Sequence, residues 1–413
     1  MITMAIDNKD KKVLKSSIER EQNEVACSAE CEKIKGSKNL NVPHLRFPEF
    51  SEEWDSFKLV ELGKFIGGGT PSSSNLSFWT GSIPWISSSD IKEDNINNIS
   101  ISRYITEDAI EKSATKYCPA PVILIVSRVG VGKVALSHTS LCTSQDFCNI
   151  IDIKCHPVFL SYNLLRTMKR KSREVQGTSI KGITSDELQK IRVFIPKNKD
   201  EQNKISNLLT LLDERIATQN KIIEDLKKLK SAIRKKMFSL LKDEYTESFE
   251  INQLLDYEQP TAYIVANDEY STDTSLTPVL TANKVFILGY TDEKFGIYQK
   301  GECIIFDDFT MDAKYVSFPF KVKSSAIKIL TAKPNVNLRF MFEYLSYWEL
   351  KSEEHKRHYI SEIASLVIEL PSKERQSIIA SLMTSLNSKL DIEAKTKIRY
   401  EEQKRYLLSQ MFI

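Results

Sequence analysis

The sequence predicts a mixed α/β protein with long α-helices: two α/β regions separated by a pair of antiparallel coiled-coil spacer helices. Three observations lead to this fold class. Two segments of about 40 residues lack Gly and Pro and carry a heptad pattern, and a strand-like run ending in proline precedes each of them. Both features also repeat at one offset, since Met237-Phe238 recurs as Met411-Phe412, 174 positions later (411 minus 237).

The length of 413 residues suits two or three domains, and the repeat divides the chain into five segments. These are an N-terminal extension (1–40), a first α/β region (41–197), a central coiled-coil helix (198–242), a second α/β region (243–371) and a C-terminal coiled-coil helix (372–413). The extension is rich in Lys, Glu and Asn and has few large apolar residues, so we expect it to be disordered or loosely helical.

Both α/β regions contain short β-branched runs separated by Gly, Pro, Ser and Asn, which is typical of strands joined by loops. These runs cover 83–91, 121–136 and 148–153 in the first region and 277–291, 301–310 and 315–330 in the second. Each region closes with a short apolar run that stops at Pro196 or Pro371, because proline cannot donate a hydrogen bond to a sheet. Outside this edge and the helix that follows, the two regions look unalike in sequence.

The two long helices carry apolar residues at alternating steps of four and three, the spacing of a coiled-coil seam. The seam residues are Ile205, Leu209, Leu212, Ile216, Ile223, Leu226, Ile233 and Met237 in the first helix, and Ile379, Met383, Leu386, Leu390, Tyr400, Leu407 and Met411 in the second. Gln219 and Lys230 interrupt the first seam and Glu393 and Lys404 the second at matching positions, which indicates a fixed register. Two ordinary amphipathic helices, each packed on its own domain, are the alternative.

Composition excludes several classes of protein. The net charge is only +3, so any binding of nucleic acid must depend on local basic surfaces. The chain has no apolar signal segment and no apolar run long enough to span a membrane, so we expect a cytoplasmic protein with no membrane contact. Seven cysteines with irregular spacing predict free thiols, and Cys27 and Cys31 alone do not complete a metal site.

Two glycine-rich motifs invite a phosphate-binding interpretation that their spacing does not support. Gly130-Val-Gly-Lys133 lacks both the earlier glycine and the following Ser or Thr of a P-loop, so we expect a tight turn between strands. The run Gly67-Gly68-Gly69-Thr70 lacks the dinucleotide-binding spacing, and we expect a flexible loop whose backbone amides and hydroxyls can bind phosphates.

Seven segments carry a resemblance to a known family: in the first region LRFPEFSEEW, GGTPS, FWTGSIPWISSSDI and SRVGVGKVAL, and in the second TPVLTANKVFILGYT, IIFDDFTMDAKY and FPFKVKSSAIKIL. They resemble the specificity subunits of Type I restriction-modification systems. The strand, Ile195-Pro196, Glu201-Gln202 and the heptad helix resemble that family's conserved spacer regions. Two departures are the longer extension and Arg375-Gln376, where the second half lacks the Glu of the Glu-Gln pair.

The resemblance implies a non-catalytic subunit whose two target-recognition domains each read one half of a bipartite, asymmetric DNA site. It implies partners as well: two methyltransferase subunits, and a restriction subunit in systems that have one. The methyltransferase subunits would bind S-adenosylmethionine, whereas this chain would bind no cofactor. Two other classes stay open: a self-contained methyltransferase or nuclease, which needs a cofactor or metal motif that we do not find, and a coiled-coil adapter that does not bind DNA.

Candidate DNA contacts are polar or basic residues of loops and one helix, where hydroxyl, carboxylate, ammonium and guanidinium groups can reach base edges or phosphates. They are Thr70, Ser72, Ser73, Ser88, Arg128, Lys133, Lys169, Arg170 and Lys181 in the first region, and Thr281, Lys284, Asp308, Thr310, Lys321 and Lys323 in the second. The plain alternative is a solvated surface, with Asp308 serving in loop capping. No catalytic residue and no metal ligand is predicted.

Overall fold

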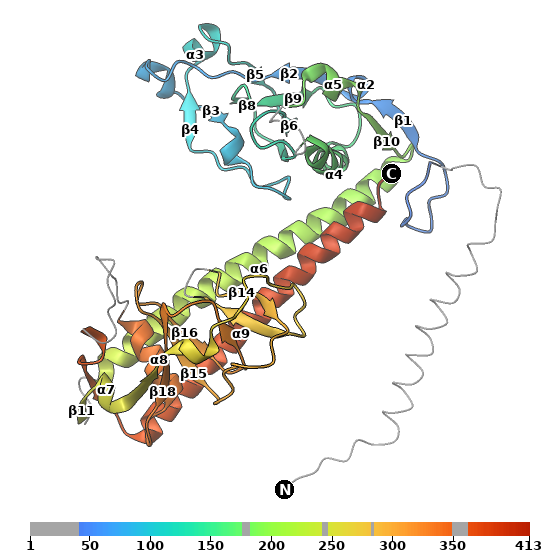
Figure 1. The fold of residues 1–413 in the computed structure, drawn as a ribbon. Helices are drawn as coiled ribbons and strands as arrows, with labels where there is room; N and C mark the ends of the chain where they lie inside the picture. Colours follow the sequence, from blue (N-terminus) through green and yellow to red (C-terminus); the bar gives the residue numbers. More distant parts are fainter. Residues whose placement is uncertain (1–40, 176–181, 242–246, 282–284, 349–361) are drawn as a thin grey trace, which may run out of the picture. The chain divides into compact units, whose positions relative to one another are not determined.

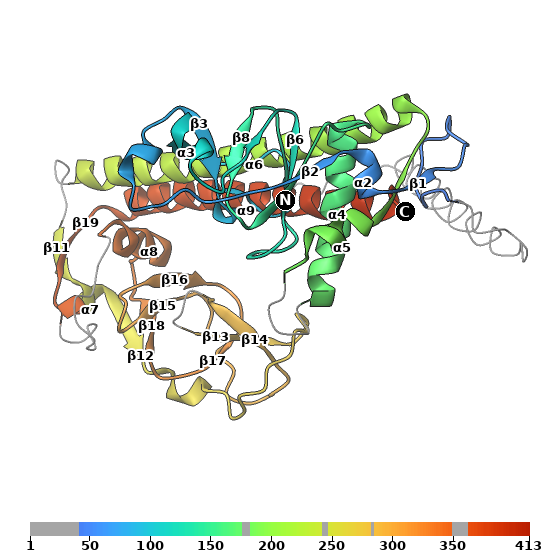
Figure 2. The same ribbon diagram turned by 90° about the horizontal axis from the view of Figure 1, so that it is seen from above.

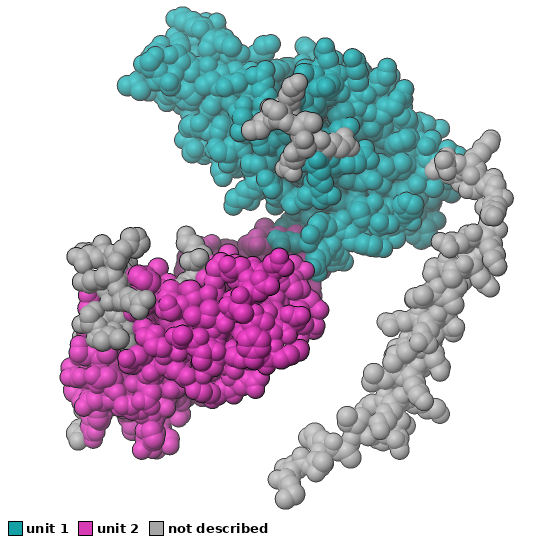
Figure 3. Space-filling model, in the orientation of Figure 1, with its two compact units in different colours: residues 1–214, 401–413 teal, residues 215–400 magenta. Residues whose placement is uncertain are grey.

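The computed structural model describes residues 41–175, 182–241, 247–281, 285–348 and 362–413. The chain divides into two compact units, which Figure 3 distinguishes by colour. Unit 1 consists of residues 1–214 and 401–413, and unit 2 of residues 215–400. Each unit therefore contains one α/β domain and parts of both long helices.

The long helices are α6 (Lys199–Leu240) and α9 (Lys373–Gln410), which begin within two residues of the predicted segment boundaries at 198 and 372 (Figures 1 and 2). In unit 1, Asp213 of α6 binds Lys404 of α9, and in unit 2, Gln219 of α6 binds Glu393 of α9. The residue number thus falls along α9 as it rises along α6, so the helices pair antiparallel. The predicted fold class is confirmed.

None of the predicted seam residues is exposed in either helix, whereas most of the positions between them are. The polar interruptions Gln219, Lys230, Glu393 and Lys404 lie in the same buried or half-buried stripe. Gln219 and Glu393 are equivalent residues of the repeat, and the Gln219 side chain donates to the Glu393 carboxylate and, at 3.2 Å, to its carbonyl oxygen. Since equivalent residues meet, a local two-fold axis relates α6 and α9 at this point.

The domain of unit 1 opens and closes with a two-stranded edge, β1 (Asp55–Lys58) antiparallel to β10 (Arg192–Ile195). Its main sheet has the order β2 (Lys64–Gly67), β9 (Phe147–Ile151), β6 (Val122–Val126), β7 (Val134–Ser137). A second sheet has the order β4 (Arg103–Ile105), β3 (Ile83–Ile86), β8 (Leu141–Thr143), β5 (Tyr117–Cys118). The helices are α2 (Leu59–Leu62), α3 (Glu107–Glu111), α4 (Pro157–Val175) and α5 (Ser185–Lys190).

The domain of unit 2 has the same edge, with β11 (Glu247–Glu250) antiparallel to β19 (Val367–Leu370). Its main sheet has the order β12 (Leu255–Glu258), β18 (Ile327–Ala332), β15 (Cys303–Asp307), β16 (Ala313–Val316). The second sheet has the order β14 (Ile287–Thr291), β13 (Thr277–Leu280), β17 (Lys321–Val322). The helices are α7 (Ile251–Leu254) and α8 (Leu338–Tyr347).

Although the two regions look unalike in sequence, their domains share the topology of the main sheet and of three strands of the second sheet, and only β5 of unit 1 has no counterpart among the described strands of unit 2. Counted from the amino end of each domain, the strands of the main sheets follow the same order and are antiparallel throughout. In both second sheets the central strand pairs antiparallel on one side and parallel on the other, as β3 does with β4 and β8 and β13 with β14 and β17. The duplication therefore extends through both domains.

Side-chain alternation along the main sheet explains why its strands are apolar on both faces. In β6, Ile123 and Ile125 pack in the core formed with α4 and the long helices, whereas Val122, Leu124 and Val126 pack against the second sheet. β15 repeats this arrangement, since Ile304 and Phe306 belong to one core and Cys303 and Ile305 to the other. Each domain thus has two apolar layers on one central sheet.

Matching contacts attach each domain to the long helices. Gln202, in the first turn of α6, donates to the Pro196 carbonyl oxygen at 2.8 Å and accepts from the His156 backbone amide at 3.0 Å. Gln376 of α9 donates in the same way to Pro371 and accepts from Asn337, both at 2.9 Å. His156 and Asn337 directly precede α4 and α8, so these two helices occupy equivalent places.

The aromatic residues of the repeated Met-Phe pairs have equivalent partners too. Phe412 packs on Phe159 of α4, with ring centroids 5.1 Å apart, and Phe238 packs on Phe340 of α8 at 5.6 Å. Each domain core therefore includes the last turn of one long helix and the first turns of the other.

Candidate nucleic-acid interface

Three segments meet at one edge of the unit 1 domain: residues 68–77 after β2, the β6–β7 loop and the β8–β9 loop. The Gly69 amide donates to the Thr143 carbonyl oxygen at 2.8 Å, and the Ser127 and Arg128 amides both donate to the Asp146 carbonyl oxygen. The Thr70 hydroxyl donates to the Gln145 side chain. The backbone thus holds the three segments together as one surface.

Exposed polar groups cover this surface. Thr70, Ser72, Ser73, Arg128 and Gln145 are all exposed. Gln and Arg are side chains that make paired hydrogen bonds to adenine and guanine in the major groove, and hydroxyls bind bases or phosphates. Gln145 was not among the predicted residues; the available signal was a polar Ser-Gln-Asp step between two apolar runs. We call these five residues the first loop surface.

The glycines beside this surface correct one prediction. A Cβ on Gly68 would lie 2.0 Å from the Ser144 carbonyl oxygen, and a Cβ on Gly69 would lie 2.3 Å from the Ala114 carbonyl oxygen. The side chains of Trp85 and Thr115 also donate to the Gly69 carbonyl oxygen. The glycines are therefore required by close packing and do not form the flexible loop that was predicted.

Several predicted basic residues of unit 1 are engaged within the domain. The Lys133 ammonium donates to the Ser88 carbonyl oxygen at 3.1 Å, and Lys169 pairs with Asp94 at 2.7 Å. Arg170 is exposed.

The predicted tight turn at Gly130–Lys133 lies between β6 and β7. Gly130 and Gly132 have φ values of +86° and +112° there, where other residues would be strained.

The corresponding loops of unit 2 are joined in the same way. The Asp308 amide of the β15–β16 loop donates to the Ala326 carbonyl oxygen of the β17–β18 loop at 3.1 Å. Thr310 and Lys323 are the exposed candidates here. The Thr310 hydroxyl donates to the Asp307 carboxylate at 2.6 Å, and the Lys323 ammonium lies 5.9 Å from the centre of the Tyr270 ring. We call Thr310 and Lys323 the second loop surface.

Three predicted DNA contacts in unit 2 are buried, and the prediction is corrected for them. Lys321 is 0% exposed, because its ammonium pairs with Glu293 at 2.5 Å and donates to the Phe295 carbonyl oxygen at 2.8 Å. Asp308 is also buried and lies 3.4 Å from the ammonium of buried Lys328. Thr281 is buried at the end of β13. Lys181 and Lys284 lie outside the described residues.

Two buried cysteines of unit 1 have thiols with raised pKa values. Burial raises the pKa of Cys118 to about 11 and that of Cys142 to about 12, so both thiols stay protonated near neutral pH. Within the described ranges, no three His, Cys, Asp or Glu side chains lie close enough together to bind a metal ion. The described helices include none that is both long and apolar enough to cross a membrane.

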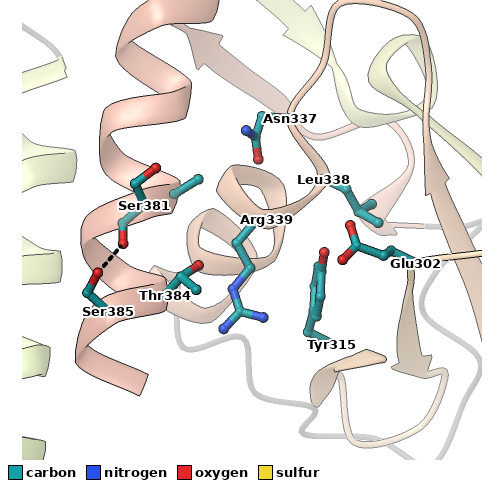
Figure 4. Close-up of a pocket in the computed structure, with 9 residues that line it drawn as sticks. Glu302, Tyr315, Asn337, Leu338, Arg339, Ser381, Thr384 and Ser385 are labelled. Atoms are coloured by element: carbon teal, nitrogen blue, oxygen red, sulfur yellow. Dashed lines mark hydrogen bonds between the residues drawn. The ribbon is translucent and has the colours of Figure 1, made fainter. Parts of the chain in front are cut away.

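A polar pocket of unit 2 lies between α8 and the first half of α9 (Figure 4). Its walls include Arg339, Tyr315 and Glu302, together with the hydroxyl side chains of Ser381 and Thr384. The Arg339 guanidinium lies 4.3 Å from the centre of the Tyr315 ring. In unit 1 the places of Arg339 and Ser381 hold Val158 and Asn207, so the pocket does not belong to the duplicated framework.

Comparison with known proteins identifies the family. The model of the Type I restriction modification DNA specificity domain matches residues 51–228 and 244–402. The chain therefore belongs to this family and contains two such domains. Each match covers one α/β domain and much of the long helix that follows it.

Two relatives support the assignment over part of the chain. The specificity subunit of the Type I restriction enzyme EcoR124I/EcoR124II from Escherichia coli is 39% identical over 178 residues, which cover 38% of this chain and 43% of the relative. The MjaIX specificity subunit from Methanocaldococcus jannaschii is 32% identical over 223 residues, covering 52% of this chain and 50% of the relative. The chain thus matches half or less of the length of these two relatives.

A solved structure shows the same fold over nearly the whole length. The S subunit of a Type I restriction-modification system from M. genitalium superposes with a TM-score of 0.62 at 17% identity, covering 90% of this chain and 99% of that one. This similarity concerns the fold alone.

Proposed function

We propose that this chain is the DNA-reading subunit of a Type I restriction-modification complex. Each domain would read one half of a bipartite, asymmetric duplex site through its loop surface, with side chains at base edges for specificity and Lys or Arg at phosphates for affinity. The α6–α9 pair would hold the two domains a fixed number of base pairs apart.

One observation carries the proposal: equivalent loops of two domains with one topology present different exposed side chains. The first loop surface offers Thr70, Gln145 and Arg128, whereas the second offers Thr310 and Lys323. Because the hydrogen-bonding groups differ while the framework repeats, the two domains should recognise different base sequences. A palindromic site would require similar side chains on both loop surfaces.

The chemistry would belong to partner subunits. We propose that two methyltransferase subunits dock on the complex and bind S-adenosylmethionine, while this chain binds no cofactor and catalyses no reaction. A restriction subunit would join where the system includes one, and the complex would act on cytoplasmic DNA. In unit 2, exposed Ile222, Leu229, Ile378 and Ile392 on the long helices provide apolar surface for such a partner.

The decisive experiment is co-expression with the methyltransferase subunit of the same system, followed by genome-wide mapping of modified adenines. We expect a two-part, non-palindromic motif with a fixed gap. A continuous short palindrome would contradict the proposal. Binding of S-adenosylmethionine by the isolated chain would instead indicate a self-contained methyltransferase, and unchanged mobility of duplex DNA with the assembled complex would indicate an adapter.

Point variants assign each half of the motif to one domain. Arg128→Ala should relax the preference at positions of one half-site only, and Lys323→Ala should act only on the other half-site or on overall affinity. Lys228→Ala is the matched control, because Lys228 is an exposed residue of α6 whose ammonium pairs with Glu224 on the same helix. The control should leave the motif and the affinity unchanged.

A further inference from the structure

Each domain meets the long helices through a polar cluster around one buried carboxylate. In unit 1, Asp213 of α6 is 3% exposed, accepts from the Tyr162 hydroxyl of α4 at 2.7 Å and pairs with Lys404 of α9. Tyr162 and Lys404 are buried as well. We call Tyr162, Asp213 and Lys404 the first junction cluster.

In unit 2 the carboxylate comes from the domain itself. Glu343 of α8 is 0% exposed and accepts from Arg234 of α6 at 2.6 and 3.0 Å and from the Asn387 side chain of α9 at 3.3 Å. Burial lowers the pKa of nearby Lys230, and the Glu343 carboxylate partly opposes this shift. We call Lys230, Arg234, Glu343 and Asn387 the second junction cluster.

The two clusters occupy the same place in the duplicated framework. Asp213 and Asn387 are 174 positions apart, as are Lys230 and Lys404. Tyr162 and Glu343 are also equivalent, since each lies six residues after the residue, His156 or Asn337, whose amide donates to the anchoring glutamine. The carboxylate has therefore changed sides: the long helix supplies it in unit 1 and the domain supplies it in unit 2.

We propose that the junction clusters determine which recognition domain can be seated at which end of the helix pair. A domain of the second kind at the first junction would bring its Glu343 carboxylate against Asp213, with Lys404 as the one cation of that cluster. A domain of the first kind at the second junction would leave Lys230 and Arg234 facing Tyr and Asn. The first exchange places two buried carboxylates against one cation, and the second leaves two half-buried cations without a carboxylate. Both leave charge without compensation at the junction, which is destabilising.

Under this proposal, four residues act as positioning residues for the domains: Tyr162, Asp213, Glu343 and Asn387. It concerns how domains are seated, and it does not depend on which DNA sequence is read. Its failure and the failure of the proposed function are therefore distinguishable, because thermal unfolding of the full chain tests the first and mapping of modified adenines tests the second.

The first test moves the carboxylate across the first junction. Asp213→Asn leaves Lys404 without its carboxylate, and Tyr162→Glu places two carboxylates together, so each should lower the unfolding midpoint of unit 1 by roughly 6 °C or more. The double variant Tyr162→Glu/Asp213→Asn moves the single carboxylate to α4, as in unit 2, with Lys404 as its cation because Leu408 stands at the place of Arg234. It should recover at least half of the larger loss. Midpoint losses that add in the double variant would overturn the proposal.

The second test uses nearly isosteric changes, so that loss of packing does not obscure the result. Glu343→Gln removes the carboxylate of the second junction and should lower the midpoint of unit 2. Glu343→Gln/Asn387→Asp returns a carboxylate from α9 and should restore most of the stability. Tyr162→Phe is the control in unit 1, because it keeps the ring and all charges, and it should cost less than Tyr162→Glu. Failure of Asn387→Asp to rescue Glu343→Gln would count against the proposal.

Discussion

Gln202 and Gln376 are single residues on which the attachment of each domain depends. Each buried side chain makes two hydrogen bonds, one to the proline that follows the last strand and one to the residue that precedes α4 or α8. We predict that Gln202→Ala and Gln376→Ala each destabilise their own unit by about 1–3 kcal/mol, since a buried proline carbonyl and a half-buried backbone amide lose their partners. Equilibrium urea unfolding would measure both effects.

We expect Gln202→Ala and Gln376→Ala to lower the stability of their units by similar amounts. Glu201 precedes Gln202, binds Arg46 and accepts from Trp54, whereas the equivalent of Glu201 in the second half is Arg375. If the glutamine is the shared anchor, its loss should matter equally in both halves despite this difference. A loss confined to unit 1 would show that Gln376 does not anchor its domain.

Lys321 and Lys323 lie two positions apart in sequence, but Lys321 is buried and Lys323 is exposed. Variants at the two positions therefore separate an effect on stability from an effect on DNA affinity. Lys321→Met should destabilise unit 2 by about 1–3 kcal/mol, because Glu293 loses its ion-pair partner and the Phe295 carbonyl oxygen loses its donor. Lys323→Met should leave stability unchanged and reduce the salt dependence of DNA binding by about one unit of slope. Calorimetry and binding titrations at several salt concentrations would test the pair, and a normal salt slope for Lys323→Met would remove that residue from the interface.

At the scale of the element, the seam of α6 and α9 contains a polar contact at its local two-fold axis. Hydrogen bonds from Lys389 and Gln219 lower the pKa of Glu393. A carboxyl group with a lowered pKa stabilises the folded state above its unfolded pKa, and that contribution is lost as the pH falls through the folded pKa. We therefore predict that the parent chain is more stable than Glu393→Gln at pH 7.

The difference in unfolding midpoint between the two chains should shrink as the pH is lowered and vanish below the folded pKa of Glu393. Differential scanning calorimetry between pH 3 and pH 7 would follow it. Glu402→Gln is the control, because Glu402 is exposed on the same helix. A difference that stays constant over this range would show that ionised Glu393 contributes nothing to the pairing of α6 and α9.

The elements differ in how far the sequence could predict them. Heptads are a local pattern of 3.5-residue period, so α6, α9 and their seam follow from the sequence. The shared topology of the two domains could not be predicted, because strands such as β2 and β9 pair across some 80 residues and their partners depend on tertiary packing. Gly68 and Gly69 illustrate the same limit, since close packing and flexibility have the same sequence signature.

Some residues of the candidate interface could likewise be predicted from the sequence, and others could not. The loops that carry Arg128, Thr310 and Lys323 could be predicted, because Gly, Ser and Asp interrupt strand-like runs there. Burial could not be predicted, so Lys321 and Asp308 looked like surface residues. Gln145 was missed because its importance comes from contact with Thr70, 75 positions earlier in the chain.

At the scale of the whole molecule, the length of the helix pair should control the gap between the half-sites that we propose. The pair can be lengthened by inserting one heptad after Ile222 of α6 and one before Leu390 of α9. Each insertion point lies three residues from the Gln219–Glu393 contact, on the same side of it, so the two seams stay paired. Copies of residues 223–229 and 383–389 continue each seam without interruption.

Each paired heptad adds about 10 Å of helix, or about three base pairs at 3.4 Å per pair. Three base pairs also turn the duplex by about 100°, given 10–10.5 pairs per turn, so a single paired heptad should bind weakly. Three paired heptads add about nine pairs, close to one turn, and should restore binding to a site with a longer gap and unchanged half-sites. Methylation of a DNA library with randomised gaps would report both outcomes, and insertion into α6 alone, which breaks the pairing of the seams, is the control. An unchanged gap in the three-heptad chain would show that the helix pair does not set the spacing.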